Sequence, residues 1–278
     1  TGQTSAVFIR KLKSVDAFVA VDIGGTPGRG VVRLAPKILQ GGAADRARSV
    51  TYALASLGRQ ETGVSAGINA QAQDRAEALA AFLAEVTGWD VGYRLTAGKG
   101  VAEGELGGLE GTHSDELVAV GAVAAAQAAL PGLGTAATNE VGTALPAELS
   151  ARGITLVDND DPIAAEVDVL FCGSKVGSVD HDAAARLSAS VVVPIGPLPI
   201  TARAMAVCVR RGIVALPDFV TTAGPLLGDA DTARIRVAGI IGEILDHPDG
   251  PTLGACERAE AFLSTWQEAL PFGRPFAP

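Results

Sequence analysis

The 278-residue chain combines 48 % hydrophobic residues with 19 % charged residues and a formal net charge of −9. Such an acidic chain argues against nucleic acid and against an anionic membrane as partners, because phosphates must be neutralised by clustered Lys and Arg. No stretch approaches 18 uninterrupted apolar residues, so the sequence predicts no spanning helix. Residues 1–13 do not resemble a signal peptide, and three widely spaced cysteines form neither a disulfide framework nor a zinc site. These features predict a cytoplasmic protein with buried, reduced thiols and no metal.

The first half of the chain predicts one strand and three helices. Residues 17–21 are a short apolar run before a Gly/Pro-rich turn, which is typical of a strand. Helices are expected at residues 45–57, 73–86 and 115–130, and the last has almost no charge after its first turn. Residues 98–111, rich in Gly and Glu, predict a loop.

In the second half, strands and helices alternate. Strands are expected at residues 154–157, 167–171, 191–194 and 214–216, and helices at residues 140–152, 182–187 and 201–211. This alternation predicts a parallel sheet with helices on its faces. Two helices at residues 230–245 and 255–269 and an extended tail complete the chain.

The predicted fold is therefore α/β with two lobes. Residues 1–128 would form an N-terminal α/β lobe of the substrate-binding type, and residues 129–228 a Rossmann-like lobe with a parallel sheet. Residues 229–278 would be closing helices that bridge the lobes or return to the first one.

Four fragments, in order along the chain, carry a resemblance to a known family. They are Pro27–Pro36 (similar to P-x-x-G-G-x-R-x-x-P), Arg46–Tyr52 (R-x-M-T-Y), Trp89–Gly92 (E-D-V-G) and Arg211–Gly224 (R-G-I-x-x-x-P-D-x-x-x-N-A-G-G). With these fragments the chain resembles the glutamate/leucine/phenylalanine/valine dehydrogenases, as a divergent member.

The resemblance implies a site for an amino- or keto-acid-like small molecule and an NAD or NADP cofactor. In the family the first fragment is a turn against the substrate, which points to Gly30 and Arg33 as substrate-binding residues. Asp90 matches the catalytic carboxylate, and Thr222 lies in the fragment that frames the nicotinamide and the substrate. The resemblance also implies a homo-oligomer, and a hetero-partner that supplies missing groups stays open.

The lysines that carry the family's chemistry are missing. Ala53 stands where one lysine grips the substrate carboxylate, and Ala66 or Ser65 stands where a second lysine activates water or ammonia. A methyl group cannot provide this charge, so the family's oxidative deamination is predicted to be lost. Ser65 is a candidate for a new catalytic role.

The dinucleotide fingerprint is altered as well. The stretch Ala137–Gly142 matches the family's G-x-G-x-x-G loop but keeps only Gly142, and Glu140 places a carboxylate where an anion should bind. Asn139 could cap the following helix, and Asp158 follows a strand at the position of the ribose-binding acid. The sequence leaves open whether NAD, NADP or no cofactor binds.

Simpler interpretations compete with these assignments. Asp90 without its lysine partner is typical of a turn carboxylate, and Asp180-His181-Asp182 is typical of a capped helix start rather than a metal site. Three functions stay open: a divergent NAD(P)-linked oxidoreductase, an enzyme of specialised metabolism that uses the same cleft without a nicotinamide, and a non-catalytic protein (a pseudoenzyme) for metabolite binding or assembly.

Overall fold

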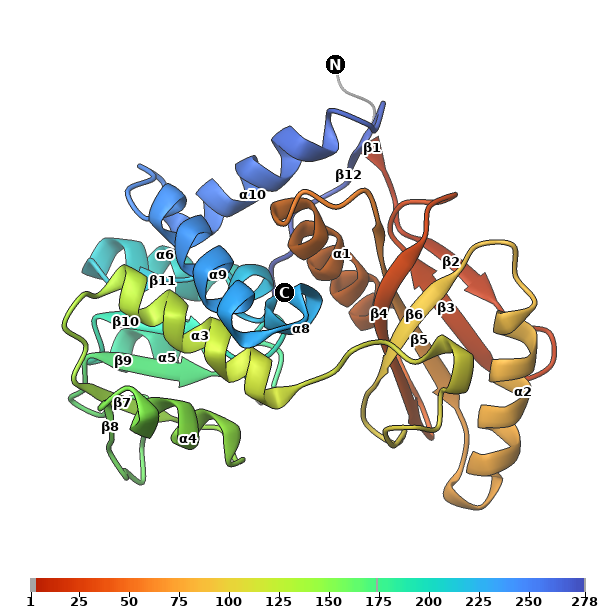
Figure 1. Cartoon of the computed structure of the whole chain (residues 1–278), viewed down its shortest axis with the longest axis horizontal. Helices are drawn as coiled ribbons and strands as arrows, with labels where there is room; N and C mark the ends of the chain where they lie inside the picture. Colours follow the sequence, from red (N-terminus) through yellow and green to blue (C-terminus); the bar gives the residue numbers. More distant parts are fainter. Residues whose placement is uncertain (1–3, 174, 278) are drawn as a thin grey trace. The chain divides into compact units, whose positions relative to one another are not determined.

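The computed structural model describes residues 4–173 and 175–277, and the chain divides into two compact units (Figure 1). Unit 1 comprises Thr1–His113 and Ala259–Pro275, and unit 2 comprises Ser114–Arg258 and Phe276–Pro278. The sequence placed the boundary near residue 128, but helix α3 (Asp115–Ala129) packs against α9 (Ala230–Ile244) and belongs to unit 2. The chain returns to unit 1 within helix α10 (Pro251–Leu263).

Unit 1 is built on a five-stranded mixed sheet. Its strand order is β2 (Phe8–Lys11), β3 (Ala17–Val21), β5 (Thr62–Asn69), β4 (Gly28–Ala35) and β6 (Tyr93–Ala97). Strand β3 is antiparallel to β2 and β5, whereas β4 runs parallel to β5 and β6. The carboxyl ends of β4, β5 and β6 therefore lie at one edge of the sheet, which is where parallel strands present ligand-binding groups.

Two helices cover opposite faces of this sheet (Figure 1). Helix α2 (Arg75–Thr87), preceded by the 3-10 turn η1 (Ala72–Asp74), packs on the face that carries Val64, Ala66 and Ile68. Helix α1 (Gln40–Ser56) packs on the other face. A Cβ atom at Gly63 would lie 1.8 Å from the carbonyl oxygen of Ala47, so only glycine lets α1 approach β5 this closely.

Unit 2 is built on a five-stranded sheet that is parallel throughout. Its strand order is β11 (Val214–Ala215), β10 (Val191–Pro194), β9 (Val169–Cys172), β7 (Thr135–Thr138) and β8 (Thr155–Leu156). In chain order from β8 this is 2-1-3-4-5, so the topological switch point lies between β7 and β9. The predicted α/β fold with a Rossmann-like parallel sheet is thus confirmed.

Helices cover the unit 2 sheet, and short elements complete the chain. Helices α5 (His181–Arg186) and α6 (Ala202–Arg211) share a core with the sheet, while α4 (Ala144–Ala151) packs against α3. The remaining elements are β1 (Thr4–Ser5), which pairs with β12 (Leu270–Pro271), and η2 (Gly107–Leu109), α7 (Asp218–Thr221) and α8 (Gly224–Leu227).

Three local expectations were wrong. The fragment Pro27–Pro36, expected as a turn, contains the eight-residue strand β4. Strands β2, β5, β6 and β7 were not predicted; in β5 only Val64 and Ile68 stand among small or polar residues, and β7 consists of Thr and Ala alone. The helix expected from residue 140 begins at Ala144, which leaves residues 139–143 as a loop.

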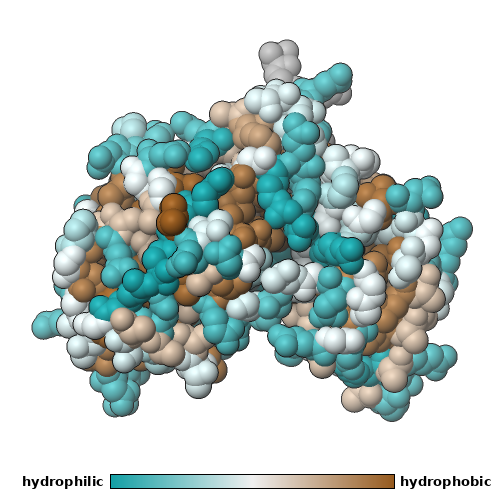
Figure 2. All heavy atoms as spheres, in the orientation of Figure 1, coloured by the Kyte–Doolittle hydropathy of each residue, from teal (hydrophilic) through white to brown (hydrophobic). Residues whose placement is uncertain are grey.

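The buried thiols agree with the sequence prediction. Cys172, Cys208 and Cys256 are all buried, as expected. Among the described residues no helix is long and apolar enough to cross a membrane, and no group of His, Cys, Asp and Glu could hold a metal ion. Figure 2 shows hydrophilic and hydrophobic residues interspersed over the face in view.

Candidate functional site

Arg33 is a partly buried cation of unit 1. It lies on β4 between Val32 and Leu34, whose side chains join the core beneath α2, so Arg33 projects from the opposite face of the sheet. Its Nε and Nη2 atoms are shielded from solvent and have no hydrogen-bond partner among the described residues. Burial lowers the pKa of Arg33. A shielded cation without a partner is costly, which makes Arg33 a candidate anion-binding residue.

Backbone hydrogen bonds hold the segment after β6 beside Arg33. The amide of Gly98 donates to the carbonyl of Val32 (2.9 Å), and the amide of Leu34 donates to the carbonyl of Lys99 (2.8 Å). A Cβ atom at Gly98 would lie 2.9 Å from Cγ of Arg33 and 2.8 Å from the Val32 carbonyl oxygen. Gly98 therefore leaves the space that the Arg33 side chain occupies.

Two lysines that the sequence did not assign to the site lie at the same end of these strands. Lys37 follows β4 by two residues, Lys99 follows β6 by two residues, and both are exposed. The sequence contained a signal for Lys99: the run Tyr93–Ala97 leads directly into Gly98-Lys99-Gly100, which places Lys99 just after the end of a strand. Gly100 has φ +82° and is approached by the Leu34 carbonyl, which explains its glycine.

Asp90 lies at the other end of the same strands. It is exposed, in the bend before β6, and β6 starts where Tyr93 pairs with Gly28. Arg33 is five residues further along β4 than Gly28, which corresponds to about 16 Å at about 3.3 Å per residue. Asp90 and Arg33 therefore do not converge on one small site, and the turn-carboxylate interpretation of Asp90 fits its position.

Three other assigned positions of unit 1 are enclosed. Ser65 is 0 % exposed on β5, paired with Ala20 and Val31, and its hydroxyl has no hydrogen-bond partner among the described residues. Gly30 is explained by packing, because a Cβ atom there would lie 1.6 Å from the Val64 carbonyl oxygen. Ala53, at a lysine position of the family, is buried within α1. Ser65 would meet a ligand only after its surroundings opened, and its catalytic role stays a prediction.

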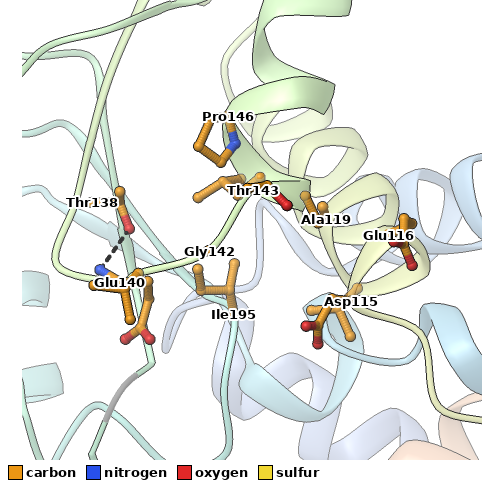
Figure 3. Close-up of a pocket in the computed structure, with 13 residues that line it drawn as sticks. Asp115, Glu116, Ala119, Thr138, Glu140, Gly142, Thr143, Pro146 and Ile195 are labelled. Carbon is orange, nitrogen blue, oxygen red and sulfur yellow. Dashed lines mark hydrogen bonds between the residues drawn. The ribbon is translucent and has the colours of Figure 1, made fainter.

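Unit 2 has a pocket of about 190 Å³ beside its switch point (Figure 3). Its walls come from the start of α3, from the loop between β7 and α4, from the start of α4, and from Ile195 after β10. The carboxyl ends of parallel strands at a switch point are where doubly wound folds bind nucleotides. This pocket therefore lies where a doubly wound fold would hold the pyrophosphate of a dinucleotide.

The charges of this pocket do not fit a pyrophosphate. Asp115 and Glu116 of α3 and Glu140 of the loop line it, and no Lys or Arg is among its lining residues. Figure 3 shows Asp115 and Glu140 on two sides of the pocket, with Gly142 between them in this view. Carboxylates at these positions oppose a bound phosphate, although the amino end of α4 attracts anions.

The predicted cofactor-binding residues occupy different surroundings. Gly142 has φ +146°, which favours glycine, and lines the pocket. The backbone N–H of Asn139 donates to the Phe171 carbonyl (3.4 Å). Asn139 does not cap the following helix, because Thr143 is the N-cap residue of α4. Asp158 is exposed, two residues after β8, and is not among the lining residues.

The Pro-Asp fragment near Thr222 has a structural role. The buried Asp218 accepts a hydrogen bond from the amide of Leu198 (2.8 Å), a residue with the positive φ of 53°. Thr222 donates its hydroxyl to the carbonyl of Asp218 (2.7 Å) at the end of α7. The fragment thereby stabilises a strained turn, and the substrate-binding role of Thr222 stays a prediction.

Comparisons with known proteins place this architecture. No protein-family model matches the chain, and no curated protein matches it in sequence. L-tryptophan dehydrogenase from Nostoc punctiforme is similar in structure, with a TM-score of 0.71, 16 % identity and coverage of 93 % of this chain and 95 % of that one. The hetero-hexameric glutamate dehydrogenase from Thermus thermophilus, in a leucine-bound form, gives a TM-score of 0.74, 18 % identity and coverage of 87 % and 82 %. Plasmodium falciparum glutamate dehydrogenase gives a TM-score of 0.71 at 12 % identity, with coverage of 90 % of this chain and 80 % of that one.

These similarities define the class of fold. The chain has the two-domain fold of amino-acid dehydrogenases, as the sequence fragments suggested. A shared fold does not transmit an activity, which must be argued from the site itself.

Proposed function

We propose that this protein binds a small amino- or keto-acid-like carboxylate through Arg33, and that the lysine-dependent oxidative deamination of this fold has been lost. The observation that carries the proposal is the shielded Arg33 guanidinium, whose Nε and Nη2 have no partner among the described residues. These two atoms form one edge of the guanidinium, the edge that pairs with both oxygens of a carboxylate. Binding would compensate a charge that the apo protein leaves unbalanced.

The exposed Lys37 and Lys99 support the same proposal through charge. Both follow strands whose carboxyl ends lie at the Arg33 end of the sheet, so they add positive potential there in a chain of net charge −9. Asp90 has no part in this proposal, because it lies at the opposite end of β4 and β6.

The proposal is tested by calorimetry with aliphatic 2-oxo and 2-amino acids. We expect the wild-type protein to bind at least one of them, Arg33→Gln to lose at least about tenfold in affinity, and Arg33→Lys to lose less, because a carboxylate bonded to two guanidinium nitrogens is a strong charge-assisted contact. Arg29→Gln is the matched control, since Arg29 lies on the same strand and face but is already paired with Glu61. Equal affinities of wild type and Arg33→Gln, or no binding of any of these acids, would overturn the proposal.

A second readout separates lost binding from lost folding. Because Arg33 is desolvated without a partner, its replacement by Gln should leave the melting temperature of the apo protein unchanged or raise it. A large fall in melting temperature would mean that Arg33 has a structural partner, and would count against a ligand-binding role.

The second candidate is an NAD(P)-linked oxidoreductase, with Asn139, Gly142 and Asp158 as cofactor-binding residues. The position of the unit 2 pocket at the switch point favours it, while the three carboxylates that line the pocket oppose it. Nicotinamide fluorescence with NADH and NADPH tests this candidate: micromolar binding would support it, and no binding by a folded protein would remove it. A homo-oligomeric assembly is proposed alongside, and sedimentation that finds only monomer would contradict it.

A further inference from the structure

A pocket of unit 1 lies at the end of the sheet opposite to Arg33. It has a volume of about 460 Å³, within the range of about 300–1,000 Å³ that is usual for small-molecule sites. It opens where β4 and β6 begin, at Gly28 and Tyr93, and its further walls come from the end of α2 and from η2. Unlike the pocket of unit 2, it combines aromatic walls with cations.

The floor of this pocket is apolar and partly aromatic. Val86, Tyr93 and Leu109 are buried, and Trp89 and Val91 pack against the same core. The rings of Trp89 and Tyr93 meet edge to face, with centroids 6.0 Å apart and planes at 84°. The guanidinium of Arg10 lies 3.6 Å from the centroid of the Trp89 ring, which fixes the orientation of that ring.

Gly28 is needed for this floor. A Cβ atom there would lie 2.8 Å from Cδ1 of Tyr93 and 2.8 Å from Cγ1 of Val64. A larger residue would displace the Tyr93 ring from the pocket wall.

The rim of the pocket is positively charged. Glu61 accepts Nε of Arg29 at 2.6 Å and Nη2 of Arg59 at 2.7 Å, on different oxygens. Burial opposes ionisation of Glu61, but the hydrogen bonds from Arg59 and Arg29 outweigh it and hold the pKa of Glu61 below its usual value. Glu61 is thus ionised at neutral pH, and its charge is shared between two guanidinium groups.

Arg94 adds a cation that faces no carboxylate. Its Nη1 donates to the carbonyl of Gly108, which holds the side chain at the pocket, and among the described residues its other N–H groups have no hydrogen-bond acceptor. The charged residues that line the pocket are Arg29, Arg94 and Glu61. Two cations against one anion leave a net positive lining in a chain of net charge −9.

We propose that this pocket binds a second small ligand, an aromatic carboxylate, with its ring against Trp89 and Tyr93 and its carboxylate at Arg94. A flat ring suits this floor because aromatic pairs gain energy beyond their buried area, and the carboxylate finds the unused donors of Arg94. The site is separate from Arg33, which lies at the other end of β4. The inference therefore does not depend on the carboxylate site proposed above.

The test uses 1-naphthoate as the probe and tryptophan fluorescence as one readout. Trp89 and Trp266 are the two tryptophans of the chain, so a Trp266→Phe background makes the signal report on the pocket. We expect 1-naphthoate to bind, and to bind more tightly than its uncharged analogue 1-naphthalenemethanol or the non-aromatic cyclohexanecarboxylate. Arg94→Gln should weaken binding by about three- to fivefold, the usual worth of one partly exposed charge pair.

Control variants locate the probe. Arg210→Gln changes an exposed arginine of unit 2, and Arg33→Gln changes the other carboxylate site, so neither should alter the affinity for 1-naphthoate. The proposal is overturned if 1-naphthoate fails to bind, if Arg94→Gln binds it as tightly as wild type, or if Arg33→Gln abolishes binding. The last result would place the aromatic acid at Arg33 and leave the Arg33 proposal standing.

Discussion

A buried ion pair between β3 and α1 offers a sharp test of how unit 1 is held together. The carboxylate of Asp22, just after β3, accepts from Nε and Nη2 of Arg48 on α1 at 2.7 and 2.6 Å, with side chains 0 % and 5 % exposed. Nη1 of Arg48 also donates to the carbonyls of Phe272 and Gly273 in the C-terminal tail. Arg48 thus joins a strand, a helix and the tail. The perturbation is Arg48→Met, which preserves bulk and removes the charge.

The magnitude follows from what Arg48→Met leaves behind. Asp22 would stay buried without its cation, which typically costs about 3–5 kcal/mol, and the two tail carbonyls would lose their donor. With a urea m-value of about 1.5 kcal/mol/M, a loss of about 4 kcal/mol lowers the urea midpoint by roughly 2.7 M. The double variant Arg48→Met/Asp22→Leu should recover a large part of this loss, because a well-packed apolar pair often replaces a buried ion pair without cost.

Tryptophan fluorescence during urea unfolding measures this effect. Trp89 and Trp266 both belong to unit 1, so their signal follows the unit that contains the ion pair. Unfolding of unit 2, followed by circular dichroism, should change less. If Arg48→Met costs less than about 1 kcal/mol, or if the double variant loses as much as the two single variants added together, the buried-pair reasoning is refuted.

Two further predictions concern packing and pH. Gly63→Ala should destabilise unit 1 by about 1–3 kcal/mol or more, because its Cβ would lie 1.8 Å from the Ala47 carbonyl oxygen, whereas Gly42→Ala, in open space in α1, should cost nothing or stabilise by up to about 1 kcal/mol. Equal effects in urea unfolding would contradict the close approach of α1 to β5. Hydrogen bonds from the amides of Gly134 and Thr135 and from the Thr135 hydroxyl lower the pKa of Asp168. Its stabilisation should therefore be complete above the unfolded pKa of about 3.9 and vanish as pH falls through the lower folded pKa. Asp168→Asn should be less stable than wild type at pH 7 and converge with it in acid, and a constant difference across that range would disprove the assignment.

The sequence by itself determined the class of fold and much of unit 2. Local side-chain patterns indicate apolar strands such as Val191–Pro194 and amphipathic helices such as Ala202–Arg211. The positions of these elements therefore agreed with expectation to within a residue or two. The four family-like fragments indicated the two-domain fold that the structural comparisons confirm. The absence of lysine at residues 53, 65 and 66 was also visible in the sequence alone.

Only the tertiary structure decided which of these residues can meet. Strand β5 contains Gly, Ser and Ala, and how well these residues suit a strand depends on the helix packed against them. No local pattern therefore identified β5 as a strand. The family resemblance gave Arg33 a substrate-binding role and Asp90 a catalytic one, yet the parallel pairing of β4 and β6 places them at opposite ends of these strands. The same neighbourhood of β4 and β6 lets the amide of Leu34 donate to the carbonyl of Lys99, which brings Lys99 beside the end of β4 that carries Arg33. Strand direction and register are long-range properties, because they arise from contacts between segments far apart in the chain.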